Sequence, residues 1–99
     1  MSETILAIEL IASDPNVRNG RPIIRGRTLR VQDVVAAHLI RHESLEDVAH
    51  AYDLSMAELH AALAYYYTHQ DEISDHLAED AARYAAHQKH WQSKLPKNT

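Results

Sequence analysis

The stretch SLEDVAHAYDLSMAELHAAL, residues 44–63, decides the fold of this chain. It contains two helix-start signals, because Ser44 and Ser55 are each followed three residues later by an acidic residue. A serine at such a position accepts a hydrogen bond from an otherwise unpaired backbone amide, and the acid returns one to the serine's own amide. The spacing predicts a short helix from residue 45 to near Tyr52 and a longer helix from residue 56 to near Tyr67.

A short helix, a tight turn and a second helix form the outline of a helix-turn-helix, a unit that places a helix in the major groove of DNA. Ala49 is expected where the two helices cross closely, over an apolar core of Val48, Tyr52, Leu54, Leu59 and Leu63. The second helix begins MAELHA, with no Arg, Lys, Asn or Gln to reach a base edge. The sequence therefore leaves open whether the unit binds DNA or is only a packing solution.

The segment before these helices is expected to form a small sheet. Residues 4–12 and 22–24 have strand-like patterns, and residues 28–31 are expected to be the return strand of a hairpin. Gly20 and Gly26, the only glycines of the chain, are expected to supply positive φ angles at the turns.

Two further helices are expected around the helix-turn-helix. A helical period runs from Gln32 to about Arg41. Beyond Thr68, one helical face carries a stripe with intervals of three or four residues: Ile73, Leu77, Ala81, Tyr84, Gln88, Trp91 and Leu95. This stripe predicts an amphipathic helix over residues 71–95, followed by a disordered tail at residues 96–99. The helix packs on its own domain, on a second copy, or on another protein.

Composition narrows the class of protein. A chain of 99 residues without cysteine fits one domain with a modest core and excludes disulfides and thiol chemistry. No segment approaches the roughly 20 apolar residues of a membrane helix, so a cytoplasmic protein without membrane contact is expected. The expected fold is mainly α: residues 1–70 form a winged or helix-turn-helix-like domain, in which a small N-terminal β-hairpin or sheet precedes a three-helix core. A C-terminal amphipathic helix follows.

Charge is distributed unevenly along the chain. The net charge is −4, yet residues 1–41 carry six arginines against four acids, while residues 42–99 carry four bases against ten acids. Five arginines gather just before the helices and are the candidate contacts for DNA phosphates: Arg18, Arg21, Arg25, Arg27 and Arg30. The alternative is that they form a solvated face of the hairpin.

Catalytic motifs are missing from the sequence. Two histidine pairs have helical spacing, His38 with His42 and His87 with His90, but neither has the glutamate of the H-E-x-x-H zinc motif. No Ser-His-Asp order, phosphate loop or nucleotide fingerprint is present. We expect no enzyme, no catalytic residue, no metal site and no cofactor, and we expect Tyr65, Tyr66 and Tyr67 to be core or interface aromatics.

Two segments, residues 14–35 and residues 44–73, together resemble the bacterial family of domains of unknown function numbered 433. The matching residues are Asp14-Pro15, Gly20, Pro22, Ile24, Gly26, Val31 and Ala62-Leu63-Ala64-Tyr65-Tyr66. The resemblance spans roughly residues 14–79. One departure is the order Gly26-Arg27-Thr28, where the family has Gly-Thr-Arg. In a strand this exchange would move the arginine to the opposite face.

The resemblance implies an antitoxin-type regulator of a type II toxin–antitoxin pair. Such a protein binds a PIN-like ribonuclease toxin, with operator DNA as a further partner. A homodimer is expected on a separate ground, because the apolar stripe is long for so small a core to cover. The arm would contact the toxin through Ile73, Leu77, Tyr84, Trp91 and Leu95. Acidic residues beside the stripe would face a basic nuclease surface: Asp71, Glu72, Asp75, Glu79 and Asp80.

The alternative function is a non-catalytic protein-interaction or scaffold module, a homodimer without DNA affinity. The acidic body of the chain and the base-poor second helix favour it.

Overall fold

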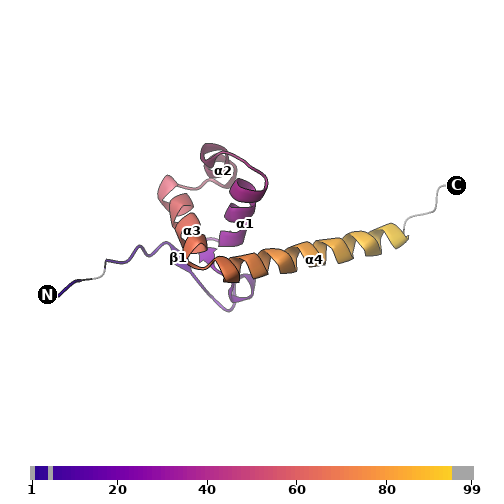
Figure 1. Ribbon diagram of the computed structural model, residues 1–99, viewed down its shortest axis with the longest axis horizontal. Helices are drawn as coiled ribbons and strands as arrows, with labels where there is room; N and C mark the ends of the chain where they lie inside the picture. The colour runs from indigo at the N-terminus through magenta and orange to yellow at the C-terminus, as the bar shows by residue number, and fades with distance from the viewer. Residues whose placement is uncertain (1, 5, 95–99) are drawn as a thin grey trace.

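The computed structural model describes residues 2–4 and 6–94, with side-chain surroundings described as far as Gln88. The fold is mainly helical with a small two-stranded sheet at the N-terminal side, as expected from the sequence. The elements are β1 (Ile11–Ala12), the 3-10 turn η1 (Arg18–Gly20), β2 (Ile23–Ile24), α1 (Val31–Val35), the π-helical turn η2 (Ala36–Ile40), α2 (Leu45–Tyr52), α3 (Met56–Thr68) and α4 (Gln70–Lys94). Figure 1 shows α1, α2 and α3 clustered together, with α4 passing beside them and projecting away.

The helix-turn-helix forms where the two serine signals predicted it. The Ser44 hydroxyl accepts a hydrogen bond from the Asp47 amide at 3.1 Å at the start of α2. At the start of α3, Ser55 and Glu58 exchange two hydrogen bonds in a full capping box. Asp53 turns the chain between the helices in the left-handed region, with φ of 53°. Both predicted helix starts are confirmed, and both helices end within one residue of the predicted positions.

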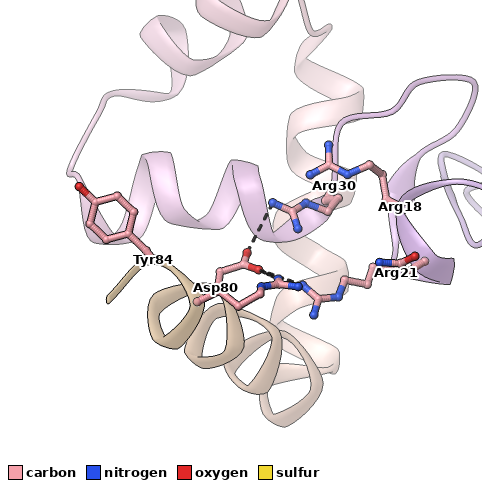
Figure 2. Close-up of a pocket in the computed structure, with 7 residues that line it drawn as sticks. Arg18, Arg21, Arg30, Asp80 and Tyr84 are labelled. Atoms are coloured by element: carbon pink, nitrogen blue, oxygen red, sulfur yellow. Dashed lines mark hydrogen bonds and ion pairs between the residues drawn. The ribbon is translucent and has the colours of Figure 1, made fainter. Parts of the chain in front are cut away.

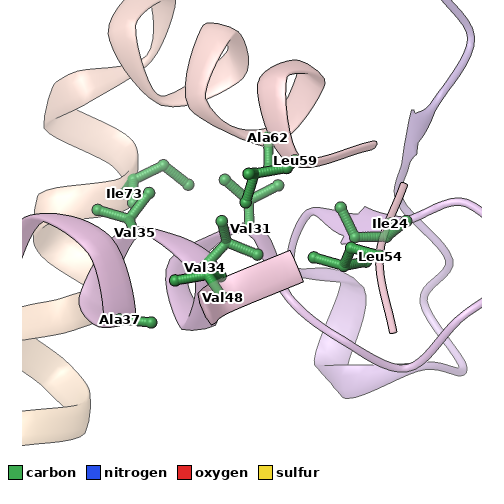
Figure 3. Close-up of a cluster of buried hydrophobic side chains, with 10 residues drawn as sticks. All are labelled: Ile24, Val31, Val34, Val35, Ala37, Val48, Leu54, Leu59, Ala62 and Ile73. Carbon is green, nitrogen blue, oxygen red and sulfur yellow. The ribbon is translucent and has the colours of Figure 1, made fainter. Parts of the chain in front are cut away.

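Ten buried apolar side chains form the core (Figure 3): Ile24, Val31, Val34, Val35, Ala37, Val48, Leu54, Leu59, Ala62 and Ile73. They come from β2, every helix, and the segments that follow α1 and α2. Of the residues predicted for the helix-turn-helix unit, Val48, Leu54 and Leu59 lie in this core, and Tyr52 and Ala49 pack against it. Leu63 is buried but is not part of this cluster. Ile73 has no exposed surface, so the first turns of α4 belong to the packed domain.

The sheet is shorter than expected. β1 and β2 pair antiparallel, Ile11 with Ile24 and Ala12 with Ile23. Among the described residues of 4–12, only these two residues of β1 form a strand. Gly20 and Gly26 lie before and after β2 with φ of 77° and 78°. The prediction that the glycines supply positive φ is confirmed.

The return strand expected at residues 28–31 does not form. Within the part of the chain that the structure describes, this segment contributes one isolated bridge, between Arg30 and Ile23. Val31 already begins α1. The physical reason is a helix cap, because the Asp33 carboxylate accepts a hydrogen bond from the Arg30 backbone amide at 3.0 Å. Because Arg30 caps the helix that begins at Val31, the second strand of the hairpin does not form.

The helix expected over residues 32–41 is present but changes its geometry midway. α1 ends at Val35, and the chain continues as the wider turn η2. The Arg41 amide donates to the Ala36 carbonyl, five residues back, at 2.9 Å. The helical period read from the sequence is thus correct in extent.

Helix α4 is longer than the domain that it packs against. Its 25 residues extend about 37 Å at 1.5 Å per residue. Ile73 is in the core and Leu77 packs against it, whereas residues 81–87 are all exposed. The long dimension of the chain is 75 Å, against 28 and 22 Å for the other two. No helix among the described residues has the length and apolar character needed to cross a membrane.

Replacing Ile73 with alanine is expected to lower the free energy of unfolding by about 2–5 kcal/mol, because it leaves a cavity in the core. Urea denaturation followed by circular dichroism measures this. Tyr84→Ala on the exposed half of the same helix is the control, with an expected change within about 0.5 kcal/mol. An effect of Ile73→Ala as small as that of the control would contradict the packing of α4 on the domain.

Candidate functional site

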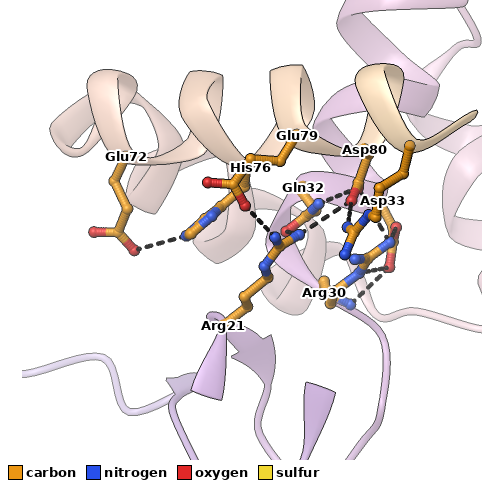
Figure 4. A network of polar contacts seen from close by, with 9 residues as sticks. Arg21, Arg30, Gln32, Asp33, Glu72, His76, Glu79 and Asp80 are labelled. Carbon is orange, nitrogen blue, oxygen red and sulfur yellow. Dashed lines mark hydrogen bonds and ion pairs between the residues drawn. The ribbon is translucent and has the colours of Figure 1, made fainter. Parts of the chain in front are cut away.

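The polar contacts concentrate where the N-terminal segment and α1 meet α4 (Figure 4). We call this place the Asp80 junction; it comprises Arg21, Arg30, Gln32, Asp33, Glu79, Asp80 and Arg83. Arg21 donates to Asp80 at 3.1 Å and also pairs with Glu79. The Arg30 guanidinium lies 3.4 Å from the other Asp80 oxygen. Asp80 further accepts hydrogen bonds from Gln32 and Arg83.

Local structure positions each group of the junction. Arg30 caps α1, and its guanidinium donates to both oxygens of Asp33, at 3.1 and 2.8 Å. This two-point contact fixes the plane of the guanidinium group beside α4. Gln32, in the first turn of α1, is only 1% exposed. Its amide is satisfied by Asp80 and Arg21, as a buried polar group requires.

The electrostatics of the junction favour the charged form of Asp80. Burial raises the pKa of this carboxyl, but hydrogen bonds from Arg83, Arg21 and Gln32 and the charge of Arg30 outweigh burial and lower the pKa. For Arg30, burial lowers the pKa, and the hydrogen bond and charge of Asp33 with the charge of Asp80 raise it overall. Both groups are therefore ionised at neutral pH.

A hollow of about 530 Å³ opens beside the junction (Figure 2). Its lining residues are Arg18, Asn19, Arg21, Arg30, Asp80, Arg83 and Tyr84. Figure 2 shows the guanidinium groups of Arg18, Arg21 and Arg30 approaching from the N-terminal part of the chain, with Tyr84 on the α4 side. The hollow is thus formed by two segments far apart in the sequence.

The remaining two arginines of the predicted phosphate-contact set lie elsewhere. Arg27 donates to the Tyr52 carbonyl at 3.0 Å and to the Asp53 carbonyl, and it pairs with Glu58 at 3.3 Å. Arg27 therefore joins the end of α2 to the start of α3. Arg25 is exposed and lies 3.6 Å from the Glu9 carboxylate.

The exchange of arginine and threonine relative to the family pattern has a different consequence from the one expected. Residues 25–28 form turns and bends and no strand, so the alternation of strand faces does not apply. Arg27 points to the helix-turn-helix, and the Thr28 carbonyl accepts a hydrogen bond from Arg18 at 3.3 Å.

The predicted arm residues separate into two groups. Ile73 lies in the core and Leu77 is half-buried against it. Tyr84 is 65% exposed and accepts a hydrogen bond from Gln88 at 2.7 Å. The Trp91 side chain and all of Leu95 lie outside the described residues, as does the tail at 96–99.

Three of the five acidic residues expected to face a nuclease make contacts within the chain. Glu79 and Asp80 belong to the junction, and Glu72 accepts a hydrogen bond from the Tyr65 hydroxyl at 3.1 Å. Burial and the Glu72 carboxylate raise the pKa of Tyr65. Asp71 and Asp75 are exposed.

The exposed surface of α3 carries little that reads DNA. Met56, His60 and Tyr67 are exposed, and no Arg or Lys lies on this helix. At the start of α3, the hydrogen bond from the Ser55 backbone amide is the main cause that lowers the pKa of Glu58. Burial raises this pKa, but the Ser55 side chain and the charge of Arg27 lower it further. Among the described residues, no three His, Asp or Glu side chains are grouped to hold a metal ion.

Sequence reasoning missed several members of this site. Arg83, Gln32 and Asp33 were not among the predicted residues, although Asp33 has a local signal, because it lies three residues after the helix cap Arg30. Gln32 and Arg83 carry no such signal, since their role depends on the distant Asp80.

A family model described as "Protein of unknown function (DUF433)" matches residues 11–66. The chain belongs to this family. No curated protein and no solved structure matches it. The region that matches the DUF433 model includes the sheet, α1, α2 and most of α3, whereas α4 begins at Gln70. Asp80, Arg83 and Tyr84 therefore lie outside the matched region.

The Asp80 junction is expected to stabilise the docking of α4. Asp80→Asn leaves Arg21 and Arg30 without a charged partner at this position, and we expect a loss of about 1–3 kcal/mol of unfolding free energy. Asp75→Asn is the matched control, since it removes the same charge from an exposed position of the same helix. Equal effects of the two changes in urea denaturation would contradict the role of Asp80.

The difference in unfolding free energy between the native protein and Asp80→Asn is expected to depend on pH. Because the folded-state pKa of Asp80 is lowered from its ordinary value of 3.8, its stabilisation is fully present above that value. It is lost as the pH falls through the folded-state pKa. The difference between the native protein and Asp80→Asn should hold from neutral pH to about pH 5 and shrink in more acidic solution.

Proposed function

We propose that this chain is a non-catalytic cytoplasmic regulator of the antitoxin type, which binds a PIN-like ribonuclease toxin through the projecting half of α4. The observation that carries the proposal is the exposure of residues 81–87 on a helix whose first turns are anchored in the domain. An anchored helix with a free half is suited to lie in a groove of a partner protein.

The composition of the projecting half supports protein binding. Residues 81–88 read AARYAAHQ, with four alanines, one tyrosine and a single formal charge, that of Arg83. Small side chains allow close approach of another surface, and an exposed tyrosine supplies a large contact area at low cost in conformational entropy. Tyr84 is the anchor that we assign to this contact.

Binding to operator DNA is the second part of the proposed function. Arg18 and Arg25 are the exposed arginines of the N-terminal segment, and phosphate contacts from them would position the protein without reading the sequence. The start of α3 offers no side chain for a base edge. The proposal therefore predicts weak, salt-dependent DNA binding by a homodimer.

A homodimeric interaction module without DNA affinity is the second candidate function. The internal pairing of Arg21, Arg27 and Arg30 with carboxylates favours it, because these charges are compensated inside the chain. Titration of a labelled duplex at two salt concentrations separates the two candidates. If phosphate contacts form, the logarithm of the binding constant falls with the logarithm of the salt concentration, with a slope of about −0.9 per contact.

The test of partner binding is co-purification of the tagged full chain from its own host, with mass spectrometry of the captured proteins. Tyr84→Ala is expected to reduce capture of a PIN-like nuclease by about tenfold or more, the factor of an interface anchor. Tyr67→Ala is the matched control, because Tyr67 on α3 is 57% exposed, close to the 65% of Tyr84.

Two outcomes would contradict the proposal. Capture of only a second copy of the chain would favour the interaction module. Equal loss of the nuclease with Tyr84→Ala and Tyr67→Ala would remove the assignment of the contact to α4.

A further inference from the structure

We propose that the hollow beside the Asp80 junction is a binding site for a phosphate group, held by Arg18, Arg30 and Arg83 next to the ring of Tyr84. The site does not depend on a protein partner and is therefore independent of the proposed toxin binding, whereas its nucleic-acid form rests on the DNA binding proposed above for Arg18. It is formed by the chain alone, from the N-terminal segment on one side and α4 on the other (Figure 2).

The charge balance of the hollow favours an anion. Four guanidinium groups and one carboxylate line it: Arg18, Arg21, Arg30, Arg83 and Asp80. Counting every described carboxylate paired with these arginines adds only Asp33 and Glu79. Four positive charges thus face three negative charges. Asp80 accepts hydrogen bonds from three side chains, so its charge is compensated within the junction.

Two exposed arginines keep guanidinium N–H donors that make no hydrogen bond among the described contacts. A guanidinium group has five N–H donors in a planar fork that matches the oxygens of a phosphate. Among the described contacts, Arg18 uses its guanidinium once, toward the Thr28 carbonyl at 3.3 Å. Arg83 is bonded to Asp80, and its side chain is 62% exposed. Arg30, in the same lining, is held in place by two hydrogen bonds to Asp33.

The backbone that carries Arg18 is in an unusual conformation. Arg18 and Asn19 have φ of 49° and 59°, in the left-handed region that residues with a side chain rarely adopt. Such conformations cost free energy, and they concentrate at ligand-binding sites. Both residues line the hollow. The fold therefore holds the Arg18 side chain at this place against a local preference.

The size of the hollow identifies the ligand class more closely. A volume of about 530 Å³ is within the range of small-molecule sites, roughly 300–1,000 Å³. It exceeds what one phosphate ion fills, and the exposed Tyr84 ring offers a flat wall for the group that carries the phosphate. The ligand is therefore a phosphate group attached to a larger body, either a small phosphate ester or the backbone of a nucleic acid.

The experiment is a titration of the isotope-labelled full chain, followed by NMR, with three probes at constant ionic strength: inorganic phosphate, adenosine monophosphate, and a 20-base-pair duplex. Sodium chloride is the anion control. Arg18→Gln and Arg83→Gln are each expected to weaken binding about tenfold, the factor for loss of one charge-assisted hydrogen bond. Arg41→Gln is the matched control, since Arg41 is exposed but does not line the hollow.

Each outcome decides the proposal. Binding of phosphate or the nucleotide that weakens with Arg18→Gln and Arg83→Gln, but not with Arg41→Gln, supports a small phosphate ester. Binding of the duplex alone with the same variant pattern supports a nucleic-acid backbone. Absence of binding by all three probes, or equal weakening by all three variants, would overturn it. Circular dichroism verifies that each variant is folded, and the two test variants lie on different segments.

Discussion

The ionised side chain of Asp80 is the contact on which the arrangement of the molecule depends. It receives a hydrogen bond or an ion pair from the N-terminal segment through Arg21, from α1 through Gln32 and Arg30, and from its own helix through Arg83. Surface ion pairs contribute about 0–1 kcal/mol each, but this carboxylate is partly buried and shared by several donors. One carboxylate thus fixes where α4 leaves the domain.

This arrangement explains why so many arginines are concentrated before the helices. Arg21 and Arg30 anchor α4, and Arg27 joins α2 to α3. These three are structural in the first instance, because their charges are paired with carboxylates of the same chain. The groups that we propose for contacts with other molecules are Arg18 and Arg83 beside Arg30 at the hollow, the exposed Arg25, and the exposed half of α4.

The parts of the fold with local signals could be predicted from the sequence. Ser44 and Ser55 determine helix starts through neighbours three residues away, and the glycines supply turn conformations that other residues rarely adopt. The return strand was predicted wrongly because two local signals compete at Arg30. The strand pattern favours extension, and the Asp33 carboxylate favours a helix cap.

The site depends on long-range contacts that one sequence does not contain. The pairing of Arg21 with Asp80 joins residues 59 positions apart, and no periodicity indicates it. The stripe from Ile73 to Leu95 predicts one continuous face, yet Ile73 is in the core while Tyr84 is exposed. Periodicity gives the face of a helix but not the point at which the helix leaves the domain. That point is set by Asp80.

Amide hydrogen exchange, measured residue by residue by NMR, tests most directly whether α4 is docked as far as Asp80 and free beyond it. For the isolated protein at low concentration, docking predicts slow exchange from Ser74 to about Arg83 and fast exchange from Ala85 to Gln88. Uniformly slow exchange to Gln88 would show that the projecting half is covered. Fast exchange already at Leu77 would show that the junction does not hold the helix, and either result would contradict this structure of the arm.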